Sequence, residues 1–233
     1  MTDRPIIMSA ESVRAILDGR KTMTRRVIVP QPLPWCVRFE PAPFDGYGLP
    51  GQWIQMSADA YSQRGLARCK YGSPGDRLWV KEKWRYADKL IDGYDRDCPY
   101  YLQYEADGTI FEINGYEGQE SIKLWEKGCD WSTCSKFGKW RAPLFMPRWA
   151  SRIMLEITGI RVERLQDISE EDAKAEGAAM WFPKSDKFRQ YTDGSYRNGF
   201  HDLWDSLNAK RGYPWSSNPW VWVIEFKRVE VQP

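Results

Sequence analysis

The stretch Gly19-Arg-Lys-Thr-Met-Thr-Arg-Arg26 joins a predicted helix to a predicted strand, and it is the segment that best indicates the fold. Apolar residues recur at helical spacing before it and predict a helix over residues 10–18, preceded by a short strand over residues 5–8. Gly19 suits the end of that helix, because glycine readily adopts the left-handed conformation that closes many helices. Residues 24–29 are rich in β-branched side chains and favour a strand. A lysine, a hydroxyl group and two arginines therefore meet at a helix–strand junction.

Further along the chain, strands and helices are interspersed without a regular alternation. Alternating apolar residues or turn signals predict strands at 77–84, 100–105, 109–113, 151–165 and 220–229. Two more helices are predicted, one from Ser169, which starts a capping-box-like sequence, to Gly177, and one from about Phe200 to Gly212. Proline-rich residues 30–57 and most of 85–147 are predicted to be irregular. This order favours an α+β fold with a curled, mixed sheet.

Composition and charge narrow the class of protein. A chain of 233 residues with 42% hydrophobic residues is long enough to bury a core, and one elaborated domain is expected. The net charge of +2 gives no global field for wrapping duplex DNA, so a nucleic-acid contact would need a local basic patch. The 13 Trp and 12 Tyr residues fill cores and can also stack on bases.

The cysteines and the apolar segments indicate the compartment. Five cysteines in no secreted-type framework predict reduced thiols and a cytoplasmic protein. No apolar run approaches the ~20 residues of a membrane span, so no membrane partner is expected. Cys98, Cys129 and Cys134 lack a Cys-x-x-Cys spacing, and neither a metal nor another cofactor is predicted. His201, the one histidine, is expected on a helix in a structural or surface role.

The junction resembles the signature of the ASCH family, a branch of the PUA-like superfamily, which reads Gly-x-Lys-x-x-Glu-x-Arg after the first helix. Gly19, Lys21 and Arg26 match this signature, and Thr24 stands where it has a glutamate. In ASCH proteins that hydrolyse N4-acetylcytidine, this position is a threonine that acts as the nucleophile beside the lysine. The whole chain looks closest to larger ASCH-like proteins of phages and prophages.

Other blocks extend the resemblance. Gly75-Asp76 is similar to a turn of the family's barrel, residues 168–177 to the helix that presents a catalytic glutamate, and residues 221–226 to its last strand. The resemblance implies a single domain over residues 1–233. It also implies a small mixed PUA-like β-barrel flanked by helices, with large irregular insertions at about 30–70 and 85–147.

The resemblance also implies a chemistry. Thr24 would supply the attacking oxygen, and Lys21 would be the base if neighbouring arginines lower the pKa of Lys21. Glu176 would orient Lys21 or bind the edge of the base, and Arg26 or a backbone N–H would steady the oxyanion. The substrate would be an N4-acylated cytidine or a related modified pyrimidine nucleoside.

A second basic and aromatic group lies at the start of the long predicted strand. Arg148, Trp149 and Arg152 are predicted to form a platform for a base or a phosphate. The chief alternative to the amidohydrolase is therefore a non-catalytic module that binds RNA or a modified nucleobase, with a nucleoside or single-stranded RNA as ligand. A ribonuclease is the third hypothesis, and the sequence leaves the oligomeric state open.

Overall fold

The structure is a computed structural model, and it describes residues 1–32, 36, 38–41, 52–56, 66–87, 100–113, 139–183 and 193–230. Contacts within the chain divide it into two compact units. The first unit contains Met1–Arg4, Ala15–Leu78 and Leu155–Val229. The second contains Pro5–Arg14, Trp79–Met154 and Glu230–Pro233. Each is described by itself below, and the single domain over residues 1–233 stays a prediction.

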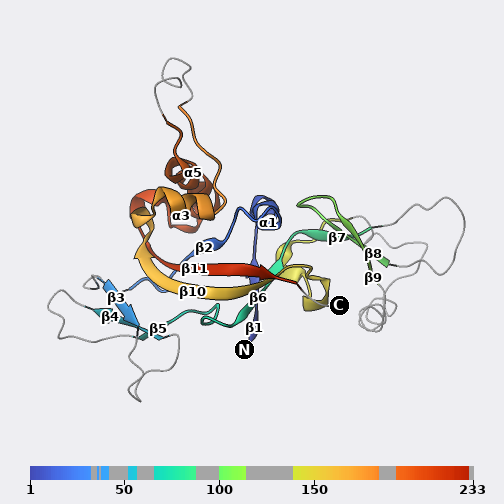
Figure 1. Cartoon of the computed structure of the whole chain (residues 1–233), viewed down its shortest axis with the longest axis horizontal. Helices are drawn as coiled ribbons and strands as arrows, with labels where there is room; N and C mark the ends of the chain where they lie inside the picture. Colours follow the sequence, from blue (N-terminus) through green and yellow to red (C-terminus); the bar gives the residue numbers. More distant parts are fainter. Residues whose placement is uncertain are drawn as a thin grey trace, which may run out of the picture. The chain divides into compact units, whose positions relative to one another are not determined.

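The fold combines helices and sheets, so the α+β class is confirmed (Figure 1). The largest sheet has the order β1-β6-β10-β11-β2, in which the strands are β1 (Asp3–Ile7), β6 (Arg77–Lys81), β10 (Met154–Arg164), β11 (Trp220–Val229) and β2 (Met23–Val27). A barrel closes only where its first and last strands pair. Here β1 and β2 are opposite edges, and the sheets of the described residues are open. The predicted closed β-barrel is therefore wrong.

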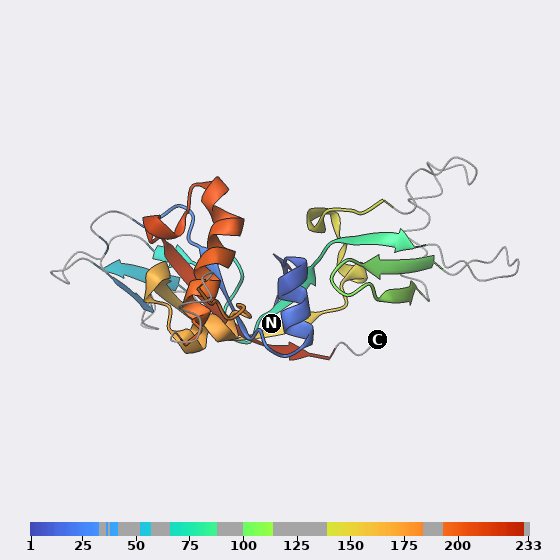
Figure 2. The same ribbon diagram turned by 90° about the horizontal axis from the view of Figure 1, so that it is seen from above.

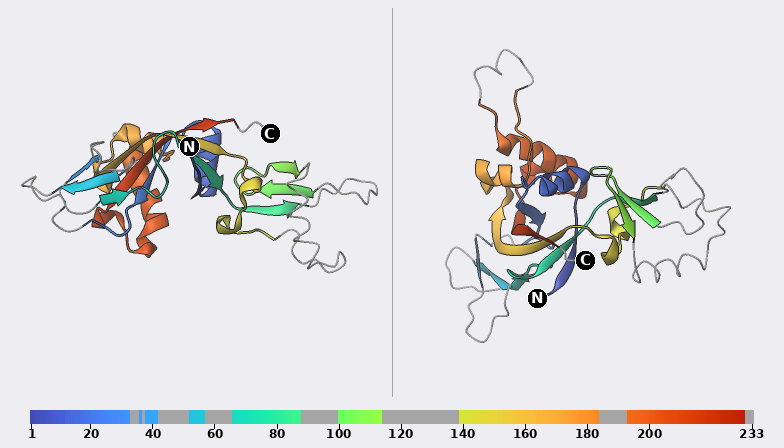
Figure 3. Two further views of the ribbon diagram at one scale, coloured as in Figure 1. Left: turned by 90° about the horizontal axis from the view of Figure 1, so that it is seen from below. Right: turned by 45° about the vertical axis from the view of Figure 1, so that its right-hand side comes forward.

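Two three-stranded sheets lie in the segments that the sequence predicted to be largely irregular. One is β3 (Arg38–Pro41), β4 (Gln52–Met56) and β5 (Leu66–Arg68), seen in light blue and teal in the left view of Figure 3. The other is β7 (Trp84–Ala87), β8 (Tyr100–Tyr104) and β9 (Ile110–Ile113), seen in green in Figure 2. The prolines of residues 30–57 did not exclude β3, because Pro41 ends an edge strand, where a missing N–H is tolerated.

Most other predicted elements are present with shifted ends. The first helix is α1 (Ala10–Leu17), and the predicted hairpin is β8 and β9. The predicted strand over 77–84 is broken into β6 and β7. The last helix, α5 (Tyr196–Asn208), begins four residues earlier than predicted, because the hydroxyl of Ser195 accepts a hydrogen bond from the Asn198 N–H and caps it.

The core of the first unit lies between the β2–β11 pair and two helices, α3 (Glu170–Ala175) and α5, which Figure 1 shows beside those strands. Ser169 caps α3 by accepting a hydrogen bond from the Asp172 N–H, as the capping-box-like sequence predicted. The buried residues of this core are Met23, Leu165, Ile168, Ala173, Ala178, Phe200, Trp204, Val221 and Val223. This packing fixes the end of α3 close to the start of β2.

Candidate active site

The turn after α1 brings the backbone of Lys21 to the end of α3. Gly19 has φ +72°, and the N–H groups of Arg20 and Lys21 both donate to the Ala15 carbonyl, at 2.8 and 2.9 Å. The chain then pairs with the residues that follow α3, since Lys21 and Glu176 form an antiparallel bridge and the Thr22 N–H donates to the Ala175 carbonyl at 2.8 Å. Backbone hydrogen bonds therefore place Lys21 beside Glu176.

The side chains of Lys21 and Glu176 form a buried ion pair. Lys21 Nζ lies 2.7 Å from Glu176 Oε2 and 2.6 Å from the Glu176 carbonyl oxygen. Each side chain is only 3% exposed. Burial lowers the pKa of Lys21, the carboxylate of Glu176 opposes that change, and the charges of Arg26 and Arg25 add to the lowering. The pair thus holds an amine that gives up its proton more readily than an exposed lysine does.

Arg25 connects this pair to a wider set of carboxylates. Its Nη2 lies 2.6 Å from Asp172 Oδ2 and 3.1 Å from Glu163 Oε2, and its Nη1 lies 3.5 Å from Glu176 Oε1. Arg161 adds a second guanidinium, which donates to Asp172, to Glu163 and, from Nη1, to Glu225 Oε1. Strand β10, strand β11 and helix α3 are thereby joined around the carboxylate of Glu176.

Thr24 and Arg26 lie on the other face of β2. In the β2–β11 register, Thr24 is opposite Ile224 and Arg26 is opposite Trp222, whereas Arg25 is opposite Val223 in the helix-facing core. Side chains alternate along a strand, so Thr24 and Arg26 point away from the side that holds Arg25. Thr24 is buried, and in the described part of the chain no side-chain hydrogen bond joins it to Lys21 or Glu176.

Arg26 still acts on the ion pair through its charge. Burial lowers the pKa of Arg26, and the carboxylate of Glu176 opposes that change. Its guanidinium carbon lies 5.9 Å from the centroid of the Tyr71 ring. Of the four predicted residues at the junction and just after α3, the structure brings Lys21 and Glu176 into contact and leaves Thr24 and Arg26 on the opposite face of β2.

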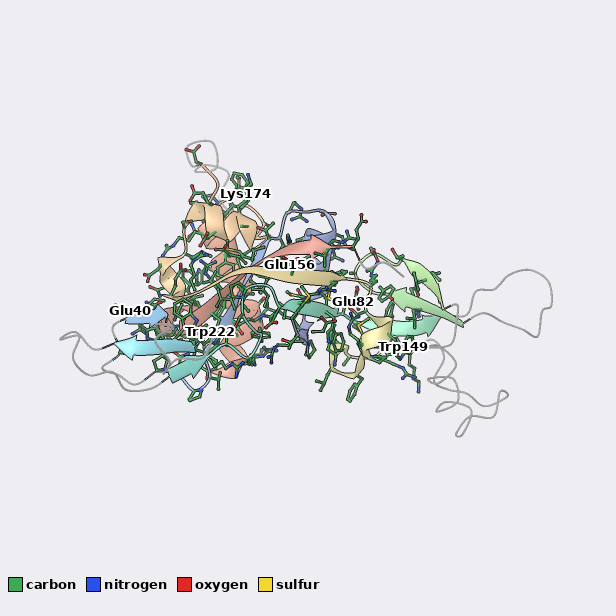
Figure 4. All side chains as sticks on the ribbon, turned by 60° about the horizontal axis from the view of Figure 1, so that its bottom comes forward. Glu40, Glu82, Trp149, Glu156, Lys174 and Trp222 are labelled. Carbon is green, nitrogen blue, oxygen red and sulfur yellow. The ribbon has the colours of Figure 1, made fainter. Side chains whose placement is uncertain are left out.

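The residues of the predicted platform belong to the second unit and make separate contacts. Arg152 forms a bidentate pair with Glu82, at 2.9 Å from each carboxylate oxygen, and a second pair with Asp107 at 2.8 Å. Trp149 packs edge-on against the buried Trp84, with ring centroids 6.4 Å apart, and Figure 4 labels Glu82 and Trp149. Trp149 and Arg152 therefore stabilise the core of the unit.

The ion pairs of Arg152 shift the pKa values around it in opposite directions. Hydrogen bonds from Arg152 lower the pKa of Asp107 to about 2, whereas burial raises the pKa of Glu82. Burial also raises the pKa of the Tyr104 phenol, whose hydroxyl donates to the Ala150 carbonyl at 2.9 Å. Arg152, Glu82 and Asp107 therefore form a network of ion pairs, and Tyr104 beside them donates a hydrogen bond of its own.

The structure describes the histidine and two of the five cysteines. His201 Nε2 lies 3.3 Å from Asp205 Oδ2 one helical turn away, and its ring contacts Trp215 at 5.0 Å. Cys36 and Cys69 are buried free thiols, while the other three cysteines lie outside the described residues. Among the residues that the structure describes, no group of His, Cys, Asp or Glu side chains is arranged to hold a metal ion.

Sequence reasoning predicted that the arginines near Lys21, Arg25 among them, would lower the pKa of Lys21. It did not identify the ion pairs of Arg25, or Glu163, Asp172 and Arg161 as part of the site. The available signal was the alternation along β2, in which a charged Arg25 stands between Met23 and Val27 on the face that packs against the helices. A charge at a core position is seldom tolerated unless it is paired. The alternation therefore indicated that acidic partners would be found nearby.

Comparison with known proteins gives no relative. No protein-family model, curated protein or solved structure matches this chain. In the part of the chain that the structure describes, none of the helices has the length and apolar composition needed to cross a membrane.

Proposed function

We propose that this protein is an amidohydrolase of ASCH, PUA-like type that removes the acyl group from an N4-acylated cytidine or a related modified pyrimidine nucleoside in the cytoplasm. The observation that carries the proposal is the buried pair of Lys21 and Glu176, in which burial lowers the pKa of the amine. A lysine with a lowered pKa can accept a proton from a nucleophile and return it to a leaving nitrogen. Glu176 holds the amine in place throughout.

The reaction requires one nucleophile and two proton transfers. The hydroxyl oxygen of Thr24 attacks the acyl carbon, and its proton passes to Lys21. The C–N4 bond then breaks while Lys21 returns the proton to the departing amine, and water hydrolyses the acyl-threonine ester to release the carboxylic acid. Arg26, on the same strand face as Thr24, is the cation that would stabilise the oxyanion.

The attacking group is the part of this mechanism that needs its own test. Thr24 lies on the face of β2 opposite Arg25, and among the described residues no side-chain hydrogen bond joins it to Lys21, so the attacking group is either the Thr24 hydroxyl or a water molecule that Lys21 activates. Acetate release from N4-acetylcytidine should be measured for the parent protein, Thr24→Ala, Lys21→Arg and Glu176→Gln. Loss of turnover in all three variants supports attack by Thr24. Turnover that survives in Thr24→Ala alone shows that water attacks, and a parent with no turnover contradicts the hydrolase.

A binding function is the second candidate, and the aromatic residues on the Thr24 face of the sheet favour it. Trp222, opposite Arg26, contacts Trp53 with ring centroids 6.2 Å apart, and Tyr71 lies against Arg26. Rings beside a guanidinium suit a nucleobase or an RNA nucleotide. Equilibrium dialysis with N4-acetylcytidine distinguishes the two, since a binding module retains the intact nucleoside and tolerates Lys21→Arg.

A further inference from the structure

A row of basic and aromatic side chains runs along one face of β6 and β7 in the second unit. From position 78 to 85, every second residue is buried, beginning with Leu78, and the residues between them remain partly exposed. The partly exposed row consists of Trp79, Lys81, Lys83 and Arg85. Trp140 lies against Arg85 and Arg148 lies near the Trp79 ring, and we call these six residues together the β6–β7 stripe.

Cations and rings of the stripe are in direct contact. The guanidinium carbon of Arg85 lies 4.6 Å from the centroid of the Trp140 ring, and Lys83 Nζ lies 5.8 Å from it. Lys81 Nζ is 5.3 Å from the Trp79 ring, and the guanidinium carbon of Arg148 is 6.0 Å from the same ring. Each tryptophan thus has two positive charges within 6.0 Å of its ring centroid.

The charge of this region is strongly one-sided. Residues 79–87 and 139–154 together contain seven Lys or Arg residues and one acidic residue, Glu82. Glu82 is buried on the opposite face, where it pairs with Arg152. Lys83 is paired with an acidic residue from outside these ranges, since its Nζ lies 2.5 Å from Glu105 Oε1. The stripe still has four basic residues in a chain whose net charge is only +2, so it is a local basic patch.

Large apolar side chains are exposed beside these charges. Trp140 is 38% exposed, and Leu144 and Phe145, in the turn next to it, are 62% and 72% exposed. The turn is attached to the stripe, because Lys81 Nζ donates to the Leu144 carbonyl at 2.5 Å. These rings and side chains leave apolar surface exposed to water beside positive charges. A ligand that has both flat aromatic faces and negative charge would cover this surface.

We propose that the β6–β7 stripe binds single-stranded nucleic acid. Phosphates would lie along the lysines and arginines, and unpaired bases would stack on Trp140 and Trp79. Positions 79 to 85 span roughly 20 Å at the rise of a β-strand, the length of about six stacked nucleotides. Duplexes fit less well, because their bases are already stacked. This site is in the second unit and does not depend on hydrolysis at Lys21.

The test is fluorescence anisotropy with a fluorescein-labelled 12-nucleotide oligo(U) and the matching oligo(dT), each at 50 and 200 mM NaCl. The parent should bind with a dissociation constant below ~100 μM at the lower salt. Trp140→Ala should raise that constant roughly fivefold or more, because a stacking contact is lost. Lys81→Gln should weaken binding and reduce the salt slope by about one.

Lys174→Gln is the matched control, because Lys174 Nζ also lies over a ring, 5.7 Å from the Tyr196 centroid, but in the first unit. It removes the same charge and should leave the dissociation constant within about twofold of the parent's. Thermal unfolding should show that Trp140→Ala, at an exposed position, remains folded. The proposal is overturned by a parent that binds neither oligonucleotide, by Trp140→Ala and Lys81→Gln binding like the parent, or by equal affinity for a 12-base-pair duplex.

Discussion

Arg25 Nη2 donates to Asp172 Oδ2 across 2.6 Å, and this bond joins β2 to the helix that presents Glu176. The Arg25 side chain is fully buried, and its guanidinium carbon lies 6.0 Å from the centroid of the Phe200 ring. Its Nη1 lies 3.5 Å from Glu176 Oε1, whereas Lys21 Nζ contacts the other carboxylate oxygen, Oε2. Arg25 is therefore a positioning residue, because it holds α3 and the carboxylate of Glu176 in place.

Arg25→Leu is expected to lower the free energy of unfolding by roughly 3 kcal/mol, measured by urea denaturation. The reason is that the substitution removes the buried cation shared by Asp172, Glu163 and Glu176 and leaves Arg161 alone to pair with Asp172 and Glu163, and removing one partner of a buried pair is costly. An equally stable variant would show that Arg161 is sufficient for these carboxylates.

Arg20→Leu provides the control for this measurement. Arg20 Nη2 lies 2.8 Å from Asp18 Oδ2, but both side chains are more than half exposed. Water and salt screen such a pair, so the free energy of unfolding should change by less than ~1 kcal/mol. If Arg20→Leu lowers the free energy of unfolding as much as Arg25→Leu does, burial of the ion pair does not determine how much its loss destabilises the protein.

The Arg152–Asp107 pair predicts how stability falls in acid. The pKa of Asp107 is lowered from 3.8 to about 2, mainly by hydrogen bonds from Arg152. Its stabilising contribution is complete above pH 3.8 and is lost as the pH falls through about 2. The free energy of unfolding of the parent should exceed that of Asp107→Asn at pH 6, and the difference should shrink toward pH 3. A difference that stays constant over this range would contradict the assignment.

Hydrophobic periodicity was sufficient to predict the helices and most strands, because local pattern determines those elements. Helix α1, hairpin β8–β9 and strand β11 lie close to their predicted positions. Closure of a barrel was not predictable in this way, because it depends on whether the two edge strands of the sheet, β1 and β2, form hydrogen bonds with each other. No local property of either strand encodes that pairing.

The contact between Lys21 and Glu176 was suggested by resemblance and has a local cause in the turn after Gly19. The contacts of Arg152 could not be read from the sequence, because its partners Glu82 and Asp107 are 70 and 45 residues away. Neighbours in sequence such as Trp149 and Arg152 suggested a shared surface. The structure gives them different roles in the core of the second unit.

The lowered pKa of Lys21 predicts that the stability of the folded protein rises with pH. This pKa is lowered from 10.5 in the folded state, chiefly by burial. In the window between the lowered pKa and 10.5, the unfolded chain binds more protons than the folded one, so raising the pH favours folding. The free energy of unfolding of the parent minus that of Lys21→Met should therefore increase from pH 7 to pH 10. A decrease would mean that Glu176 raises the pKa of Lys21 more than burial lowers it.

Gly177, directly after Glu176, predicts a coupling between backbone geometry and the candidate site. It has φ +77°, and a Cβ atom there would lie 2.8 Å from the Ala15 Cβ and 3.2 Å from the Lys21 Cβ. Gly19 has nearly the same backbone angle, φ +72°, but a Cβ atom there would meet nothing within 4 Å. The two glycines therefore differ in crowding and share the strain of a left-handed conformation.

Gly19→Ala should cost only that strain, about 1–2 kcal/mol in the free energy of unfolding. Gly177→Ala should cost clearly more, because Ala15 on α1 and Lys21 must also move away from the added methyl group. That movement acts on Lys21, so Gly177→Ala should also reduce deacetylation of N4-acetylcytidine under conditions where both variants are fully folded, while Gly19→Ala retains it. Urea denaturation and acetate release measure the two effects separately. Equal stability losses in the two variants would show that the contact of Gly177 with Ala15 and Lys21 does not constrain the site.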